Sequence, residues 1–216
     1  MLTAMRLIGA AASAAFVAIS LFAARPGSNY RFSALFLVPI VWAVYFLRRR
    51  IHLHPLHYGM FAAALLLHNL GAFGLYQRAV LGLSFDIYVH FYFGVVGGLL
   101  LYRYLGRTVA LTPWQLRVAT VLLVLGMGGV HEIVEWFSTL VLGPKHGMLK
   151  TVGVYAFDTQ RDMFDNLLGA ALAVTGYVFV RRVRTQQARP EREHGVPVVG
   201  LENARESPGV VPSARG

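Results

Sequence analysis

Acidic and histidine side chains recur at helical spacing in three apolar stretches of the chain. In "DIYVH", Asp86 and His90 are four residues apart, and in "HEIVEW", His131 and Glu135 have the same separation. Residues four apart share one face of a helix. The third stretch, "DTQRDMFDNLLGA", spaces its polar residues at intervals of 4, 3, 1 and 3, which forms one stripe of Asp158, Asp162, Asp165, Asn166 and Gly169. Each stretch therefore predicts a helix with one polar face.

Carboxylates combined with imidazole are typical ligands of Zn, Mn or Fe. Crowded carboxylates repel one another, and a divalent cation would relieve that repulsion. We predict a shared metal site whose ligands are Asp86, His90, His131 and Asp162. Glu132 and Glu135 are the candidates for a catalytic general base. The open alternative is that some acids stay protonated, or pair with Arg161 and the histidines.

Further polar residues are expected to line the same pocket. All of them lie toward the same end of the predicted helices. They are His68, Asn69, Asp158, Gln160, Arg161, Asp165 and Asn166. Small residues allow helices in membranes to approach closely. Glycines that could bring the polar faces together are Gly94, Gly97, Gly126, Gly128 and Gly129.

The elements that carry these residues are predicted to be transmembrane helices. The chain is 56% hydrophobic and only 14% charged, against about 25% charged in soluble domains, and its mean hydropathy is +0.54. About 20 apolar residues cross a bilayer as a helix. The fold class is therefore all-α: a polytopic membrane protein with about six transmembrane helices, in apolar segments at 5–24, 32–47, 56–76, 86–105, 115–141 and 162–180.

Two regions are predicted: a six-helix transmembrane domain over residues 1–184, and a disordered cytoplasmic tail over 185–216. The tail is rich in Pro, Arg and Glu and has too little apolar content to pack. The chain has no cysteine, which excludes disulfides, thiolate metal sites and cysteine nucleophiles.

Basic residues near helix ends favour the cytoplasmic side. With the amino terminus inside, ten basic residues fall inside and six outside, and the inner set includes the run Arg48, Arg49 and Arg50. We therefore expect both termini in the cytoplasm of a bacterial inner membrane. The net charge of +10 is then mainly a topology signal and gives no support to nucleic-acid binding. The same topology places all six acidic residues of 1–180 toward the outer side: Asp86, Glu132, Glu135, Asp158, Asp162 and Asp165.

The stretch "DTQRDMFDNLLGA", with "HEIVEW" and the Asp86–His90 pair before it, resembles the YjdF-type bacterial inner-membrane family, whose biochemical function is uncharacterised. The likeness runs from the third to the sixth predicted helix. YjdF-type sequences tend to carry an extra acid before the Asp-Thr-Gln stretch, where this chain has "GVYAF". A more distant similarity is to VanZ-like membrane proteins, whose Asp-x-x-x-His pattern would fall on Asp86 and His90. The resemblance supplies no reaction.

Three classes of function remain open on these observations. The leading hypothesis is a metal-dependent hydrolase or transferase with an outward-facing site, acting on a lipid or lipid-linked envelope substrate by means of a metal-bound water. The rival is a proton- or cation-coupled transporter, which the one-sided placement of the acids and the lack of an inverted repeat disfavour. A non-catalytic envelope-binding or assembly protein is the third.

Overall fold

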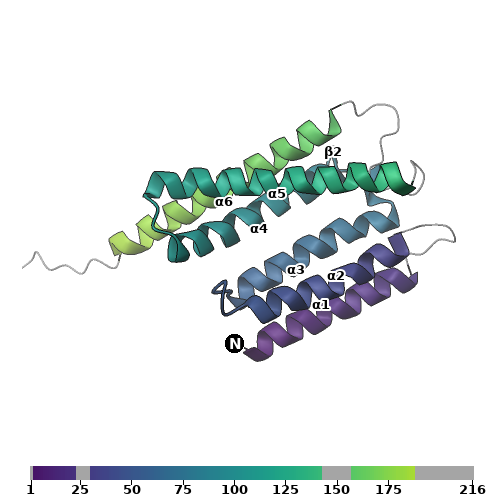
Figure 1. The fold of residues 1–216 in the computed structure, drawn as a ribbon, viewed down its shortest axis with the longest axis horizontal. Helices are drawn as coiled ribbons and strands as arrows, with labels where there is room; N and C mark the ends of the chain where they lie inside the picture. The colour runs from purple at the N-terminus through teal and green to yellow at the C-terminus, as the bar shows by residue number, and fades with distance from the viewer. Residues whose placement is uncertain (1, 23–29, 143–156, 188–216) are drawn as a thin grey trace, which may run out of the picture. The chain divides into compact units, whose positions relative to one another are not determined.

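A computed structural model describes residues 2–22, 30–142 and 157–187 of the chain. Within these ranges lie six α-helices, which confirms the predicted all-α class (Figure 1). Their bounds are α1 Leu2–Phe22, α2 Tyr30–Leu47, α3 Pro55–Asn69, α4 Phe85–Thr108, α5 Pro113–Leu142 and α6 Asp158–Gln187. The chain divides into two compact units, Met1–Val180 and Arg181–Gly216. The predicted disordered tail, apart from the last turn of α6, lies outside the described residues.

Four of the helices are long and apolar enough to cross a bilayer: α1, α4, α6 and residues Pro113–Val141 of α5. Helix α2 contains a shorter apolar stretch, Ala34–Leu47. Length and hydropathy are the properties that a bilayer selects, since about 20 apolar residues match its hydrocarbon core. These spans indicate a membrane protein.

The main apolar core lies where α1, α2 and α3 pack against one another. Its most buried members include Phe16 of α1, Val41 of α2 and Tyr58 of α3. The Tyr58 hydroxyl donates a hydrogen bond to the Val41 carbonyl over 3.1 Å, so the phenol is both packed and satisfied. Gly9 of α1 leaves room for this hydroxyl, because a Cβ there would lie only 2.8 Å from it. These three helices thus form a packed layer beside α4.

The third helix is shorter than the apolar segment predicted at 56–76. Helix α3 ends at Asn69 and is followed by two 3₁₀ turns, η1 Leu70–Phe73 and η2 Leu75–Gln77. Gly74, with φ of 82°, joins the two turns in a left-handed conformation that ends any helix. Hydropathy alone could not mark this end, because the residues after Asn69 remain mostly apolar.

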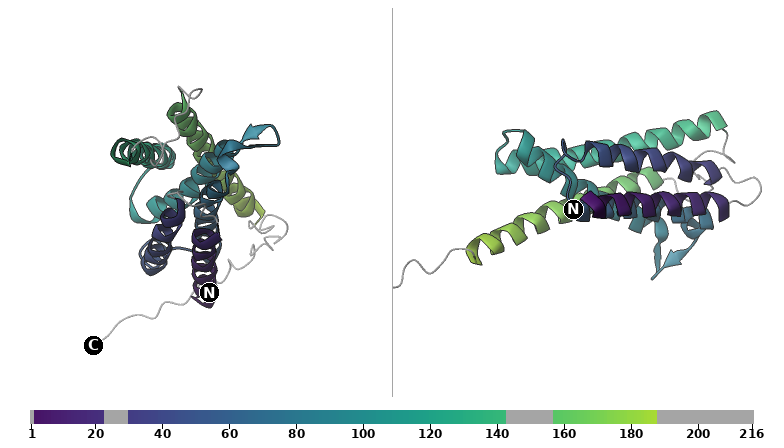
Figure 2. Two further views of the ribbon diagram at one scale, coloured as in Figure 1. Left: turned by 90° about the vertical axis from the view of Figure 1, so that its right-hand side faces the viewer. Right: turned by 90° about the horizontal axis from the view of Figure 1, so that it is seen from below.

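A small hairpin connects these turns to α4. Strand β1 (Ala79–Val80) pairs antiparallel with β2 (Leu83–Ser84), and the hairpin projects from the helices in Figure 2. Its two turn residues, Leu81 and Gly82, both have positive φ, as a tight two-residue hairpin requires. Helix α4 begins directly after the hairpin, which places Asp86 in its first turn. The hairpin therefore fixes where the first acidic residue of the chain lies.

Candidate functional site

The site depends on an unusually close approach of α4 and α6. A Cβ on Gly94 of α4 would overlap the backbone of Asn166, and a Cβ on Gly169 of α6 would overlap the backbone of Phe91. One turn further along α4, a Cβ on Gly98 would lie 3.1 Å from Ala170. Small residues at such crossings let two helix backbones touch. The polar side chains of the two helices consequently meet.

Asp86, His90 and Asp162 form the centre of the site. Nε2 of His90 lies 3.5 Å from Oδ1 of Asp86 and 3.5 Å from Oδ2 of Asp162. One ligand atom from each of the three residues lies within 4.8 Å of the others. His90 and Asp162 are buried, at 8% and 4% exposure. The Asp86–His90 pair comes from one turn of α4, whereas Asp162 arrives from α6.

Arg161 is the cation that links the carboxylates of this cluster. Its Nη2 lies 2.8 Å from Oδ2 of Asp86, 3.0 Å from Oδ1 of Asp158 and 3.7 Å from Oδ1 of Asp162. Three carboxylates share one guanidinium, so the four groups together carry a formal charge of −2 when all are ionised. Asp86 divides its two oxygens, one toward Arg161 and one toward His90. Such a contact fixes the orientation of a carboxylate.

Asn166 contacts the other nitrogen of the His90 ring. Its Nδ2 lies 3.3 Å from Nδ1 of His90, and both residues are buried. If the amide nitrogen donates, Nδ1 of His90 accepts, and the ring proton stands on Nε2 between the two aspartates. If the amide is turned over, its oxygen accepts from Nδ1–H, and the Nε2 lone pair is free to bind a metal. With the Asn166 amide nitrogen toward His90, the residues form a hydrogen-bonded cluster. With the amide oxygen toward His90, the cluster can bind a metal.

Helix α5 contributes two polar contacts to the same end of the structure. Thr159 of α6 donates its hydroxyl proton to Oε2 of Glu132 over 2.9 Å, and Glu132 is buried at 6% exposure. His131 Nε2 lies 3.1 Å from Oε1 of Glu135, one turn along α5. The His131 side chain is 38% exposed. His131 thus pairs with a carboxylate of its own helix and does not share the ligand set of His90.

Three histidine rings from three helices form a row in space, and His90 of the central group is the last of them. The ring of His68, at the end of α3, is 5.7 Å from the ring of His131, and that ring is 6.2 Å from the ring of His90. His68 Nδ1 is 2.7 Å from the hydroxyl of Tyr76 in η2. Imidazole is the side chain whose ordinary pKa lies nearest to neutral pH, so such a row of rings contains groups that can take up and release protons.

Three buried carboxylate oxygens accept no hydrogen bond from the described part of the chain: Glu132 Oε1, Asp162 Oδ1 and Asp165 Oδ2. A buried acceptor without a donor costs about 1–3 kcal/mol, and more when it is charged. Protons, cations or water are the species that satisfy carboxylate oxygens. This end of the helices is therefore built to take up positive charge.

The predicted residues differ in how the structure places them. Asp86, His90, Asp158, Arg161, Asp162 and Asn166 are joined by direct contacts. Gln160 is exposed, and buried Asn69 donates its amide to the Leu65 carbonyl of its own helix over 3.1 Å. Of the predicted glycines, Gly94 and Gly128 face Asn166, Gly97 faces Val124, and Gly126 faces open space.

Two residues of the site were not among those predicted from the sequence. Thr159 holds Glu132, and its only sequence signal is its place in the "DTQRD" stretch. Tyr76 reaches His68 because the chain turns after Asn69. No sequence signal predicted that turn.

A family model described as "Predicted membrane protein (DUF2238)" matches residues 4–182. The chain belongs to this membrane-protein family. The match extends over all six helices of the DUF2238 protein and confirms the YjdF-type resemblance at the level of the family. No curated protein and no solved structure matches the chain. The similarity to VanZ-like proteins stays a prediction.

Proposed function

We propose that this DUF2238 protein is a membrane-embedded, metal-dependent hydrolase or transferase whose divalent cation is bound by Asp86, His90 and Asp162. The spacing of the three ligand atoms is the observation that supports the proposal. Ligands held tetrahedrally at about 2.1 Å from zinc lie about 3.4 Å apart. Nε2 of His90 is 3.5 Å from an oxygen of each aspartate.

The charge and the surroundings of these residues favour a divalent cation. The formal charge of −2 around Arg161 is balanced by one such ion, with His90 neutral as a ligand must be. A mixed nitrogen and oxygen donor set suits Zn, Mn or Fe. Arg161 on the second oxygen of Asp86, and Asn166 on Nδ1 of His90, provide the outer contacts that orient metal ligands.

The reaction proposed is attack by water on a lipid or lipid-linked substrate. A bound cation supplies a water that ionises near neutral pH. Glu132 is the proposed general base, because Thr159 fixes one of its oxygens and the other accepts no hydrogen bond from the described residues. The neighbouring face of α5 is apolar and exposed, as at Ile133, Trp136 and Phe137. We propose that the substrate approaches along this face from within the membrane.

The metal content of the purified protein tests the proposal. We expect about one divalent ion per chain by elemental mass spectrometry, and its loss in Asp86→Asn and in Asp162→Asn. Asp165→Asn is the matched control, since it removes a buried carboxylate of α6 outside the ligand set. A metal-free wild type, or equal loss in all three variants, would contradict the site.

Catalytic activity is tested separately from metal content. Protein with and without metal is incubated with bacterial membrane lipid extract, and the products are compared by mass spectrometry. Glu132→Gln is expected to keep the metal and to lose the metal-dependent products. If Glu132→Gln and wild type give the same products, Glu132 is not the base.

Proton transport is the second candidate, and the sequence of rings from His68 through His131 to His90 favours it. In this case the cluster would carry protons and no metal. Proteoliposomes with an internal pH dye distinguish the two functions. Proton flux that is lost in His131→Ala, from protein that binds no metal, would favour the transporter.

A further inference from the structure

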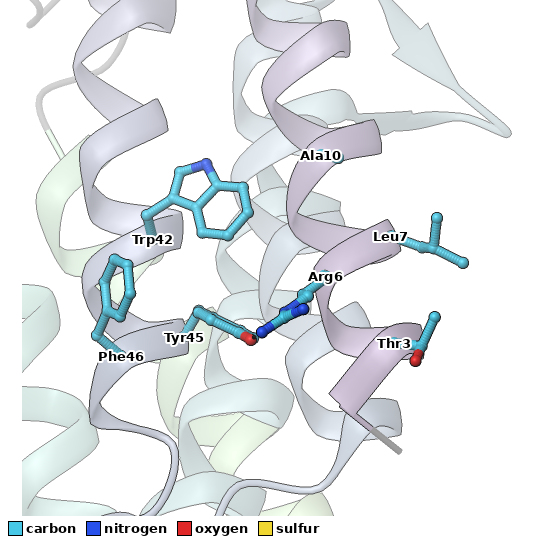
Figure 3. A pocket seen from close by; sticks show the side chains of 7 residues that line it. All are labelled: Thr3, Arg6, Leu7, Ala10, Trp42, Tyr45 and Phe46. Atoms are coloured by element: carbon cyan, nitrogen blue, oxygen red, sulfur yellow. Dashed lines mark hydrogen bonds between the residues drawn. The ribbon is translucent and has the colours of Figure 1, made fainter.

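A second candidate site lies on α1 and α2, at the end of these helices that carries the basic loop 48–50. It is an open surface groove of about 460 Å³. Thr3, Arg6 and Leu7 line it from α1, and Trp42, Tyr45 and Phe46 line it from α2. Figure 3 shows Arg6 extending from α1 toward the hydroxyl of Tyr45. The groove therefore combines one cation with an apolar and aromatic surface.

Arg6 is held in this groove by a neutral partner. Its Nε donates to the Tyr45 hydroxyl over 3.1 Å. Tyr45 is itself fixed from the other side, because the guanidinium of Arg48 stacks 4.2 Å from the centre of its ring and donates to its carbonyl over 2.9 Å. These contacts orient the Arg6 guanidinium but leave its positive charge without compensation from Tyr45.

No acidic side chain of the described structure is available to balance that charge. The sequence contains no Asp or Glu before Asp86. The acids of α4 and α6 that contact Arg161, and Glu132 of α5, which accepts from Thr159, lie at the opposite end of the helices. Arg107, near the end of α4, donates to the His52 carbonyl over 3.5 Å, so the described residues at this end of the helices include a further cation. Because Arg6 is exposed, its charge is accessible to an anionic group that enters the groove.

Trp42 marks the apolar side of the groove. Its indole N–H donates to the Ser13 hydroxyl over 3.0 Å, which fixes the ring between α1 and α2. Its ring also lies 6.3 Å from that of Phe46, which is 70% exposed. An acyl chain could lie along these rings while a phosphate reaches Arg6. Long basic side chains near helix ends typically place their charge at the level of the lipid headgroups.

We infer that this groove binds one anionic phospholipid, with its phosphate at Arg6 and Thr3 and an acyl chain along Trp42 and Phe46. A lipid satisfies both features at once, since it brings the negative charge and the apolar chain. The groove lies on α1 and α2, whereas the metal ligands lie on α4 and α6. The lipid site is consequently independent of the proposed enzymatic function.

The test uses Trp42 fluorescence in the full-length chain. Trp114 and Trp136, both exposed, are replaced by Phe so that Trp42 is the only tryptophan. The protein is placed in vesicles containing dibrominated phosphatidylglycerol or dibrominated phosphatidylcholine, whose bromines quench on contact. We expect phosphatidylglycerol to quench with about fivefold higher apparent affinity, the effect of one arginine near a lipid phosphate. Equal quenching by the two lipids would overturn the inference.

Variants that each remove one arginine charge distinguish a specific lipid site from a general attraction of anionic lipid to basic residues. Arg6→Gln should abolish the preference for phosphatidylglycerol. Arg49→Gln, which removes an exposed charge from the basic loop 48–50 beside the groove, should retain it. A preference that survives Arg6→Gln, or that disappears equally in Arg49→Gln, would contradict the site. A protein whose only tryptophan is Trp114 should show no preference. Relief of quenching by millimolar glycerol phosphate would indicate a soluble organophosphate as the occupant, and would overturn the lipid assignment.

Discussion

The Asn166 amide on α6 lies 3.3 Å from Nδ1 of His90 on α4, while Nε2 of the same ring faces two aspartates. This contact controls which nitrogen of His90 carries a proton. A metal ligand requires the lone pair on Nε2, so Nδ1 must then donate to Asn166. The pair is therefore the most direct point at which to test the metal site.

Asn166→Ala is predicted to weaken metal binding, and Asn166→Asp is predicted to maintain or strengthen it. The carboxylate can only accept from Nδ1–H, which frees Nε2, whereas alanine leaves the ring without an orienting partner. Loss of such an outer contact typically costs about 10–100-fold in metal affinity. Competition titration against a chelator measures the change. Asn69→Ala is the control, because this similarly buried amide donates its hydrogen bond to Leu65 of its own helix.

Arg161→Gln is predicted to make folding depend on added metal or on acid. The substitution leaves Asp86, Asp158 and Asp162 without their shared cation. Their repulsion falls when a divalent ion binds or when one carboxylate is protonated, so the stability of the variant should rise as the pH falls. Because the Arg161 side chain is 31% exposed, we expect less than the full 3–5 kcal/mol of a buried ion pair.

Thermal unfolding in detergent, with and without metal and across pH, checks this prediction. The wild type should show a smaller dependence on both variables, since Arg161 already compensates one charge. A variant as stable as wild type at neutral pH without metal would mean that the carboxylates do not act as a cluster.

Gly94→Ala is predicted to separate α4 from α6 and to disrupt the site. The added methyl group would overlap the Asn166 backbone, and overpacking of this kind costs about 1–3 kcal/mol or more. Gly126→Ala is the matched control on α5, where a Cβ would meet nothing within 4 Å. That change should be neutral or stabilise by up to about 1 kcal/mol, because alanine favours helix. Gly94→Ala should therefore have a lower melting temperature and a lower metal content than Gly126→Ala. Similar values for the two variants would contradict the close contact of α4 and α6 at Gly94.

The topology is predicted to place both termini in the cytoplasm. The run Arg48, Arg49 and Arg50 and the basic start of the tail favour that side. Reporter fusions at Arg50 and Gly216 should give the cytoplasmic signal, and a fusion at Lys145 the external one. The reversed pattern would place the acidic cluster on the cytoplasmic side and remove the basis for an envelope substrate.

The sequence alone determined the properties that depend on neighbouring residues. Hydropathy over about 20 residues identified the four helices that are long enough to span a bilayer, α1, α4, α5 and α6, since a bilayer selects for length and apolarity. The i,i+4 rule paired Asp86 with His90 and His131 with Glu135, because the helical period is local. The concentration of acids near one end of three helices was likewise visible in the printed chain.

Only the tertiary structure decided which of these groups share a site. The crossing at Gly94 and Gly169 sets the register of α6 on α4, and this register brings Asp162 and Asn166 to His90. His131 carries the same chemistry, yet its ion-pair contact is with Glu135 of its own helix, and it is not part of the group formed by Asp86, His90 and Asp162. Register between helices arises from the fit of surfaces distant in sequence, which no local pattern encodes.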